Sequence, residues 1–254
     1  MGNGRGMKHV TASGIAGVGL TLSAVVVAQA APIKLVPNEI AAGDRYGSAV
    51  SVWGNVAVVG SPHDDENGAN AGAVFLLRRD CSSWVVDRKL FHEDVGAGEL
   101  FGCAVAIREN VLVVGADGSN AGAAYVFRFD GGDWVFEQKL LPDPAASPMN
   151  FGTALAVGGN VIVVGADEDD ENETESGAAY VFRFDGKSWA REQKLSASDG
   201  EAFDFFGSAV AIEGGLWEIY IGGAAGGSVR KGDLLLTVKT HDEVLLYMGR
   251  FMQY

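Results

Sequence analysis

Short apolar runs recur along the chain at regular intervals. Each run consists of four valine-rich positions followed by a glycine, at Val56–Gly60, Val111–Gly115 and Val161–Gly165. A run of this length that is apolar throughout is typical of a β-strand covered on both faces. A residue pair such as Gly54-Asn55 precedes each run and favours a tight hairpin turn, because such turns need positive φ. The pattern therefore predicts hairpins whose second strand is buried.

Two further strands are predicted after each buried run. Residues 124–129 alternate aromatic and other side chains, so the aromatic residues share one face. Residues 134–140 begin with a tryptophan and are more polar. Apolarity thus falls from the second strand to the fourth, as it does from the axis to the rim of a propeller blade.

The predicted strands form one repeating unit of about 50 residues. An aromatic-glycine pair opens each unit, at Tyr46, Phe101, Phe151 and Phe206, with spacings of 55, 50 and 55 residues. All the length variation falls in one loop after the buried run, as expected for stacked structural units. The sequence predicts an all-β fold, a β-propeller with four-stranded blades at residues 46–100, 101–150 and 151–205.

The units resemble the FG-GAP repeat, the blade of integrin α-subunit propellers. The resemblance rests on Phe-Gly at the start of a unit and Val-Val-Gly-Ala or Val-Val-Gly-Ser-Pro fourteen residues later, and it covers about residues 34–215. Outer strands that end in Gln-Lys-Leu, at 138–140 and 193–195, make it similar to repeats of secreted bacterial proteins. The resemblance implies a propeller that acts in binding or cell adhesion. Integrin-like repeats bind calcium between the FG and GAP strands, but this connection is too short here to carry that site over.

The repeat pattern breaks at both ends. Residues 31–45 are predicted to hold the outer strand of a closing blade, because Lys34-Leu35 has the same spacing to Tyr46 as later Lys-Leu pairs have to their aromatic residues. Residues 206–254 begin a fourth unit and then diverge. Two explanations stay open. In the first, a four-bladed ring closes through residues 33–36. In the second, the chain is truncated and forms an incomplete ring of about three full blades and a divergent fourth. The open edge of such a ring favours self-association.

The first thirty residues match a secretory signal peptide. Arg5 and Lys8 precede an uncharged, largely apolar stretch that ends in Ala28-Gln29-Ala30, an A-x-A cleavage sequence. We expect residues 1–30 to be removed, the mature protein to be secreted or periplasmic, and no membrane insertion after cleavage.

Charge narrows the class of partner. The chain has 33 Asp and Glu residues against 19 Lys and Arg residues, a net charge of −14. Nucleic-acid binding is not expected, because it requires a cationic face. Two cysteines are too few for a disulfide framework.

Acidic residues gather in the loops after the first and third buried runs. Calcium takes six to eight oxygen ligands from a compact turn, and these loops offer several. The candidate calcium ligands are Asp64, Asp65, Asn67, Asp167, Asp169, Asp170 and Glu171. The alternative is a solvated surface turn, which uses the same residue types.

No catalytic motif accompanies the repeat. The chain contains neither H-E-x-x-H nor G-x-S-x-G. The small residue after each aromatic-glycine pair cycles through Ser48, Cys103, Thr153 and Ser208, as a packing position would. The sequence predicts a secreted, non-catalytic propeller that binds an extracellular protein or carbohydrate, with calcium in its acidic loops. The alternatives are a propeller lyase or hydrolase with a site at the axis, and a fragment of a larger surface protein without independent function.

Overall fold

The structure is a computed structural model that describes residues 34–81, 83–118, 121–142, 149–198, 200–213, 218–223, 233–240 and 243–250. Residues 213, 218, 233–240 and 243–250 are described by their backbone alone. The chain divides into two units, residues 1–34 and 35–254, and every strand described below belongs to the second. The signal-peptide prediction for residues 1–30 falls outside the described residues. Within the described ranges, no helix has the length and apolarity needed to cross a membrane.

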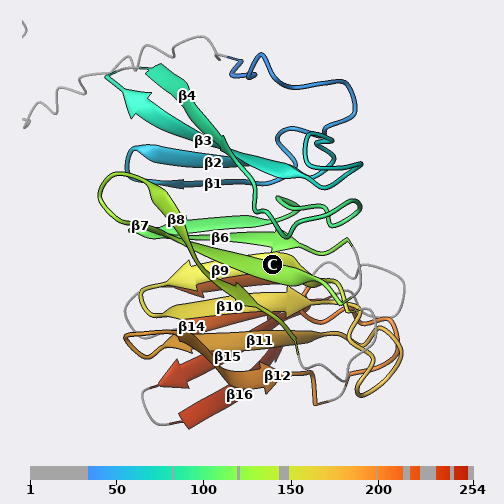
Figure 1. Ribbon diagram of the computed structural model, residues 1–254. Helices are drawn as coiled ribbons and strands as arrows, with labels where there is room; N and C mark the ends of the chain where they lie inside the picture. Colours follow the sequence, from blue (N-terminus) through green and yellow to red (C-terminus); the bar gives the residue numbers. More distant parts are fainter. Residues whose placement is uncertain are drawn as a thin grey trace, which may run out of the picture. The chain divides into compact units, whose positions relative to one another are not determined.

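The strands form four antiparallel sheets of four strands, which follow one another in chain order (Figure 1). Blade 1 contains β1 (Val50–Trp53), β2 (Val56–Ser61), β3 (Ala73–Asp80) and β4 (Ser83–Leu90). Blade 2 contains β5 (Val105–Arg108), β6 (Val111–Ala116), β7 (Ala123–Phe129) and β8 (Trp134–Leu140). Blade 3 contains β9 (Phe151–Gly158), β10 (Val161–Ala166), β11 (Ala178–Phe184) and β12 (Trp189–Leu195). Blade 4 contains β13 (Ala209–Glu213), β14 (Glu218–Gly222), β15 (Asp233–Thr240) and β16 (Glu243–Arg250).

The hydrophobic core lies between the blades. Alternate residues of one strand point to opposite faces of its sheet. In β6, Leu112 and Val114 therefore pack with blade 1, whereas Val111 and Val113 pack with blade 3. This explains why the runs Val56–Gly60, Val111–Gly115 and Val161–Gly165 in the second strands of blades 1, 2 and 3 are apolar throughout, as the sequence analysis expected.

The aromatic-glycine pairs join consecutive blades. Gly72 forms a parallel β-bridge with Phe101, and the same bridge recurs between the later blades. A Cβ atom on Gly72 would lie 2.2 Å from the carbonyl oxygen of Phe101, and Gly72 has a φ of +88°. Only glycine fits this close approach. The ring of Phe101 then packs edge-on against Tyr125 of its own blade, with ring centroids 5.3 Å apart.

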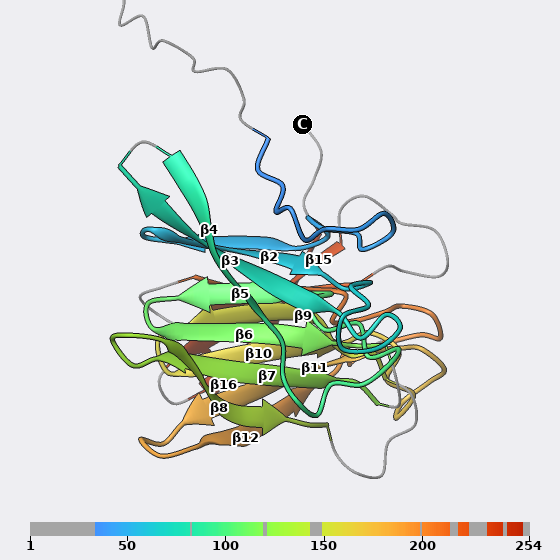
Figure 2. The same ribbon diagram turned by 45° about the horizontal axis from the view of Figure 1, so that its top comes forward.

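The inner strands contact one another in the order β1, β5, β9 and β13, and Figure 2 labels the middle pair, β5 and β9. The two middle strands, β5 and β9, have an inner strand on each side and are mostly buried, whereas β1 and the described side chains of β13 are more exposed. This is the pattern of an incomplete ring. The fourth blade forms a complete sheet although its sequence diverges.

The segment before blade 1 differs from its prediction. Residues 34–45 contain turns and no strand, because β16 supplies the outer strand of blade 4. Leu35, Ile40 and Tyr46 instead pack on the face of blade 1 that points away from blade 2.

Candidate functional site

Three lysines occupy equivalent positions at the end of the outer strands of blades 1, 2 and 3. Each lies above the aromatic residue of the adjacent third strand. Lys89 Nζ is 5.6 Å from the ring centroid of Phe75, Lys139 Nζ is 4.7 Å from that of Tyr125, and Lys194 Nζ is 5.4 Å from that of Tyr180. Each of these blades thus holds an ammonium group over an aromatic ring, a favourable cation–π geometry.

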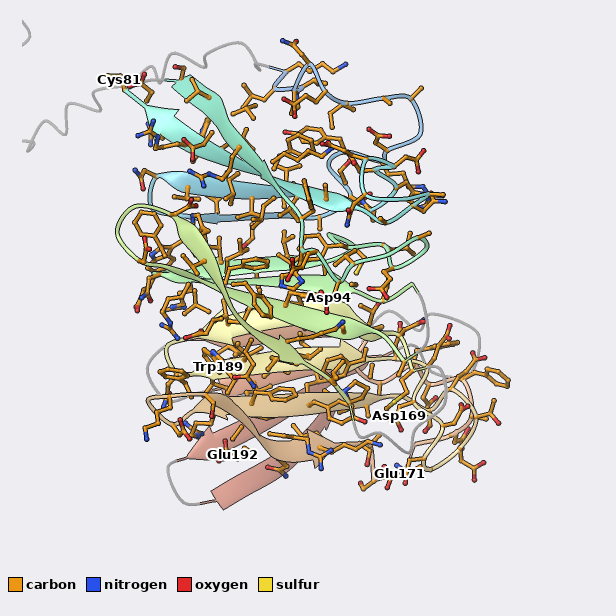
Figure 3. The ribbon with its side chains drawn as sticks, in the orientation of Figure 1. Cys81, Asp94, Asp169, Glu171, Trp189 and Glu192 are labelled. Atoms are coloured by element: carbon orange, nitrogen blue, oxygen red, sulfur yellow. The ribbon has the colours of Figure 1, made fainter. Side chains whose placement is uncertain are left out.

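In blade 3 the lysine forms a partly buried ion pair with the long acidic loop, in which the carboxylate is the buried partner. Lys194 Nζ lies 2.8 Å from Asp169 Oδ2 and also contacts Glu171. The Tyr180 hydroxyl donates to Asp169 Oδ2 at 2.9 Å, and the backbone N–H of Glu171 donates to Asp169 Oδ1 at 3.1 Å. Both oxygens of Asp169 are therefore engaged. Figure 3 shows Asp169 and Glu171 toward the loop end of the sheets, with Trp189 toward the opposite end.

Blade 1 repeats this arrangement. Lys89 Nζ lies 2.7 Å from Asp64 Oδ2 and 2.5 Å from Glu66 Oε2. The backbone N–H of Glu66 donates to Asp64 Oδ1 at 3.1 Å. Burial opposes the charge of Lys89, but the hydrogen bonds to the two carboxylates outweigh it and raise the pKa of Lys89. Phe75 takes the place of the tyrosine, so this loop lacks the hydroxyl donor.

Blade 2 obtains its carboxylate from another segment. The loop after β6 is five residues shorter than its counterparts, and Lys139 pairs at 2.9 Å with Asp94, which lies in the connection into the blade. Burial is the main reason that the pKa of Tyr125 rises to about 12, and the Asp94 and Glu99 charges add to it. The lysine position is thus paired in blades 1, 2 and 3, whichever segment supplies the carboxylate.

The remaining candidate ligands of the acidic loops mostly bond to the backbone nearby. Asp65 Oδ1 accepts the backbone N–H of Asn70 at 2.7 Å, and Asp170 Oδ1 accepts that of Glu175 at 2.6 Å. Asn67 donates through Nδ2 to the carbonyl oxygen of Val95 at 2.7 Å. These bonds are those of ordered turns. Across the described part of the chain, no group of three or more His, Cys, Asp or Glu side chains is placed to hold a metal ion.

Asp167 lies apart from its neighbours in sequence and forms a second acidic feature with Asp117. The two residues follow β10 and β6, at equivalent positions. Asp117 hydrogen-bonds with Cys103 and Asp167 with Asn150, and burial raises the pKa of both carboxyl groups. Asp167 Oδ1 is buried and has no hydrogen-bond partner among the described atoms. The sequence analysis did not pair these residues, although Val-Val-Gly-Ala-Asp occurs in both blades and not in blade 1.

The serine hydroxyls at the small-residue position after each aromatic-glycine pair bond to turn carbonyl groups. Ser48 Oγ donates to the carbonyl oxygen of Arg45 at 2.7 Å, and Ser208 Oγ donates to that of Gly222 at 3.4 Å. Cys103 is half-buried, Cys81 is exposed, and both are free thiols. His63 Nδ1 lies 2.7 Å from Asn70 Oδ1, and His92 contacts Asp94.

Four-stranded sheets stacked through their faces, with inner strands in chain order, define a β-propeller protein. The chain belongs to the FG-GAP repeat family, which matches residues 32–77, 84–127, 134–182 and 189–224. The second, third and fourth matches begin within the first two residues of the outer strands β4, β8 and β12 and continue into the following blade, so one family repeat spans parts of two blades. β15 and β16 lie beyond the last match.

Two known proteins are similar to parts of the chain. A stretch of 45 residues is 56% identical to "Nitrite reductase [NAD(P)H]" of Bacillus subtilis (strain 168), covering 18% of this chain and 6% of that protein. A solved structure of an Aleuria aurantia lectin mutant in complex with alpha-methyl-L-fucoside is similar with a TM-score of 0.45 and 14% identity. That similarity covers 78% of this chain and 59% of the lectin chain. The chain thus spans less than two thirds of either protein.

Proposed function

We propose that this protein is a non-catalytic binding module that presents its acidic loops to an extracellular protein or carbohydrate. The observation that carries the proposal is the repeated lysine–carboxylate pair. Lys89 and Lys194 each tether one long loop to an outer strand, while Asp65, Glu66, Asp170 and Glu171 stay exposed.

The loops are also tied to the segment that leads into the next blade. The backbone N–H of Leu100 donates to the carbonyl oxygen of Asn70 at 3.2 Å, and that of Phe205 donates to the carbonyl oxygen of Glu175 at 3.1 Å. A loop held in one conformation loses less entropy when it binds a partner. An exposed acidic surface fixed in this way suits a partner with basic groups or sugar hydroxyls.

Binding to a glycan array and to a panel of secreted proteins tests this proposal. We expect a saturable partner whose affinity falls at least tenfold when Glu66 and Glu171 are both changed to Gln. Asp80→Asn removes an exposed carboxylate at the β3–β4 turn and serves as the control. Loss of affinity in the control alone, or no saturable binding to any probe, would contradict the proposal.

Calcium in the acidic loops is a separate part of the proposal, and the lysines count against it. Asp64 and Asp169 already bind ammonium groups, so each loop keeps few free oxygens toward the six to eight that calcium takes. A ligand that binds the folded state raises its stability by mass action, by about 2.7 kcal/mol at a hundred times its Kd. If millimolar calcium leaves the melting temperature unchanged, calcium is not part of this protein's function.

A hydrolase or lyase is the second candidate, favoured by Asp117 and Asp167. Two half-buried carboxyl groups with raised pKa values are the groups that general acid–base chemistry uses. Activity on a panel of polysaccharides that is lost in both Asp117→Asn and Asp167→Asn would support an enzyme.

The binding module is also proposed to be secreted after removal of residues 1–30. Amino-terminal sequencing of exported protein should then find a start near residue 31.

A further inference from the structure

Phe203 is an exposed aromatic residue with a backbone conformation that bulky residues rarely adopt. It is 45% exposed, and its φ is +68°. It lies three residues before the aromatic-glycine pair of blade 4, and glycine occupies the same position before blades 1 and 2, as Gly43 and Gly98. Both glycines have positive φ, +110° and +79°. The position therefore favours glycine, and a phenylalanine there adds backbone strain.

Packing does not require a ring at this position. A Cβ atom on Gly43 or Gly98 would meet no atom within 4 Å beyond its chain neighbours. A side chain here thus projects into open space, and the ring of Phe203 has the half-buried Phe205 beside it, with ring centroids 6.4 Å apart. Neither the backbone nor the core explains the aromatic residue. A residue that is strained and yet exposed points to a role in binding.

The backbone of Phe203 lies against the long acidic loop of blade 3. Its N–H donates to the carbonyl oxygen of Thr174 at 2.9 Å. Residues 167–175 and 200–206 together hold nine acidic residues and no basic one. The exposed ring therefore belongs to a strongly anionic part of the surface.

The same blade shows what a ring and carboxylates of this kind can bind. Lys194 Nζ lies 5.4 Å from the ring centroid of Tyr180 and 2.8 Å from Asp169 Oδ2. Blades 1 and 2 hold equivalent lysines in the same way. Among the described residues, none of the cation–π contacts involves Phe203. A partner can therefore supply the cation for this ring.

We propose that Phe203, with the exposed carboxylates of Glu173 and Glu201, binds a lysine or arginine side chain in a basic segment of a partner protein. The inference rests on the proposed binding function of the acidic loops and names the class of partner. A cation over the ring gains a cation–π interaction, and the carboxylates complement its charge. A neutral partner offers the carboxylates no counter-charge, so the cost of removing them from water is not offset.

Isothermal titration calorimetry of the full chain with a hexa-arginine peptide tests this inference. We expect saturable binding and about fivefold weaker affinity for Phe203→Leu, which keeps an apolar side chain and removes the aromatic ring. Glu173→Gln combined with Glu201→Gln should also weaken binding. Phe129→Leu is the matched control, because Phe129 is 39% exposed at the end of β7, and it should bind as the wild type does. A hexacitrulline peptide, which is neutral and similar in shape, should not bind.

Phe203→Gly separates binding from folding. It should weaken binding as Phe203→Leu does and melt at the same or a higher temperature than Phe203→Leu, because glycine adopts positive φ without strain. The inference is overturned by a hexa-arginine peptide that does not bind, by equal affinity of the wild type and Phe203→Leu, by equal binding of hexacitrulline, or by a Phe203→Gly that melts below Phe203→Leu. If a secreted partner still depends on Glu66 and Glu171 in any of these cases, the proposed function stands and only its cationic partner class fails.

Discussion

Replacing Lys194 by methionine tests whether the lysine–carboxylate pairs hold the loops in place. The change keeps most of the aliphatic side chain above Tyr180 and removes only the ammonium group. Asp169 would then be a buried carboxylate without a counter-charge, since its side chain is 3% exposed. Breaking a buried ion pair by removing one partner costs about 3–5 kcal/mol.

Two donors remain for Asp169 and reduce that cost. The Tyr180 hydroxyl and the backbone N–H of Glu171 still bond to its two oxygens. We therefore expect a loss of about 2–4 kcal/mol in the free energy of unfolding. For a chain of this size that loss corresponds to a decrease of roughly 4–16 °C in melting temperature.

Thermal unfolding followed by circular dichroism measures the effect, and hydrogen exchange of residues 167–176 locates it. Lys187→Met is the control, because Lys187 is exposed in a turn of the same blade. Adding Asp169→Asn to Lys194→Met removes the unpaired charge and should recover part of the loss. A melting temperature for Lys194→Met that equals the control, or a double variant less stable than the single one, would refute the reasoning.

Three further predictions concern the joints between blades and the buried tyrosine. Gly122→Ala should lower the free energy of unfolding by more than about 3 kcal/mol, because its Cβ would lie 2.2 Å from a backbone oxygen. Gly131→Ala, at a glycine with positive φ but open space around it, should lower it by about 1 kcal/mol. Equal losses for the two variants in chemical denaturation would contradict this prediction. Burial raises the pKa of Tyr125 to about 12, so its neutral form stabilises the fold fully below about pH 10 and this stabilisation is lost as the pH rises toward 12. Tyr125→Phe should remove one late-titrating tyrosine from the absorbance titration and flatten that alkaline loss, and an unchanged titration would argue against the burial. Gln138→Ala should lower the free energy of unfolding by about 1–3 kcal/mol and speed hydrogen exchange of the Trp189 amide, because the Gln138 side chain forms two hydrogen bonds, of 2.8 and 2.7 Å, with the Trp189 backbone. An unchanged rate of hydrogen exchange at Trp189 would count against this link between blades.

The strands and blades could be predicted from the sequence because their signals are local. Apolar runs identify strands covered on both faces, and aromatic-glycine pairs mark the joints where only glycine allows the backbones to approach. The constant spacing of these signals indicates that one unit is repeated. The start of the fourth blade was also predicted, because residues 209–212 resemble the first strands of the other units, and β13 forms there.

The role of individual acidic residues could not be predicted in the same way. The acidic residues at alternate positions 167, 169 and 171 would bind one calcium ion together if the loop were a single turn. In the structure Asp167 directly follows β10 and lies near Asp117, whereas Asp169 bonds to Lys194, which is 25 residues away and two strands further along the sheet. Spacing in sequence gives no information on which strand a loop folds against.

The sequence by itself therefore determined that this chain is a series of propeller blades and where each blade begins. Only the tertiary structure decided which charges meet and which apolar residues stay exposed. Val52 and Ile107 occupy equivalent positions in the inner strands of blades 1 and 2, yet Ile107 is buried against the preceding blade and Val52 is 52% exposed. The reason is physical: strand formation depends on neighbours along the chain, whereas burial and charge pairing depend on which sheet is packed alongside.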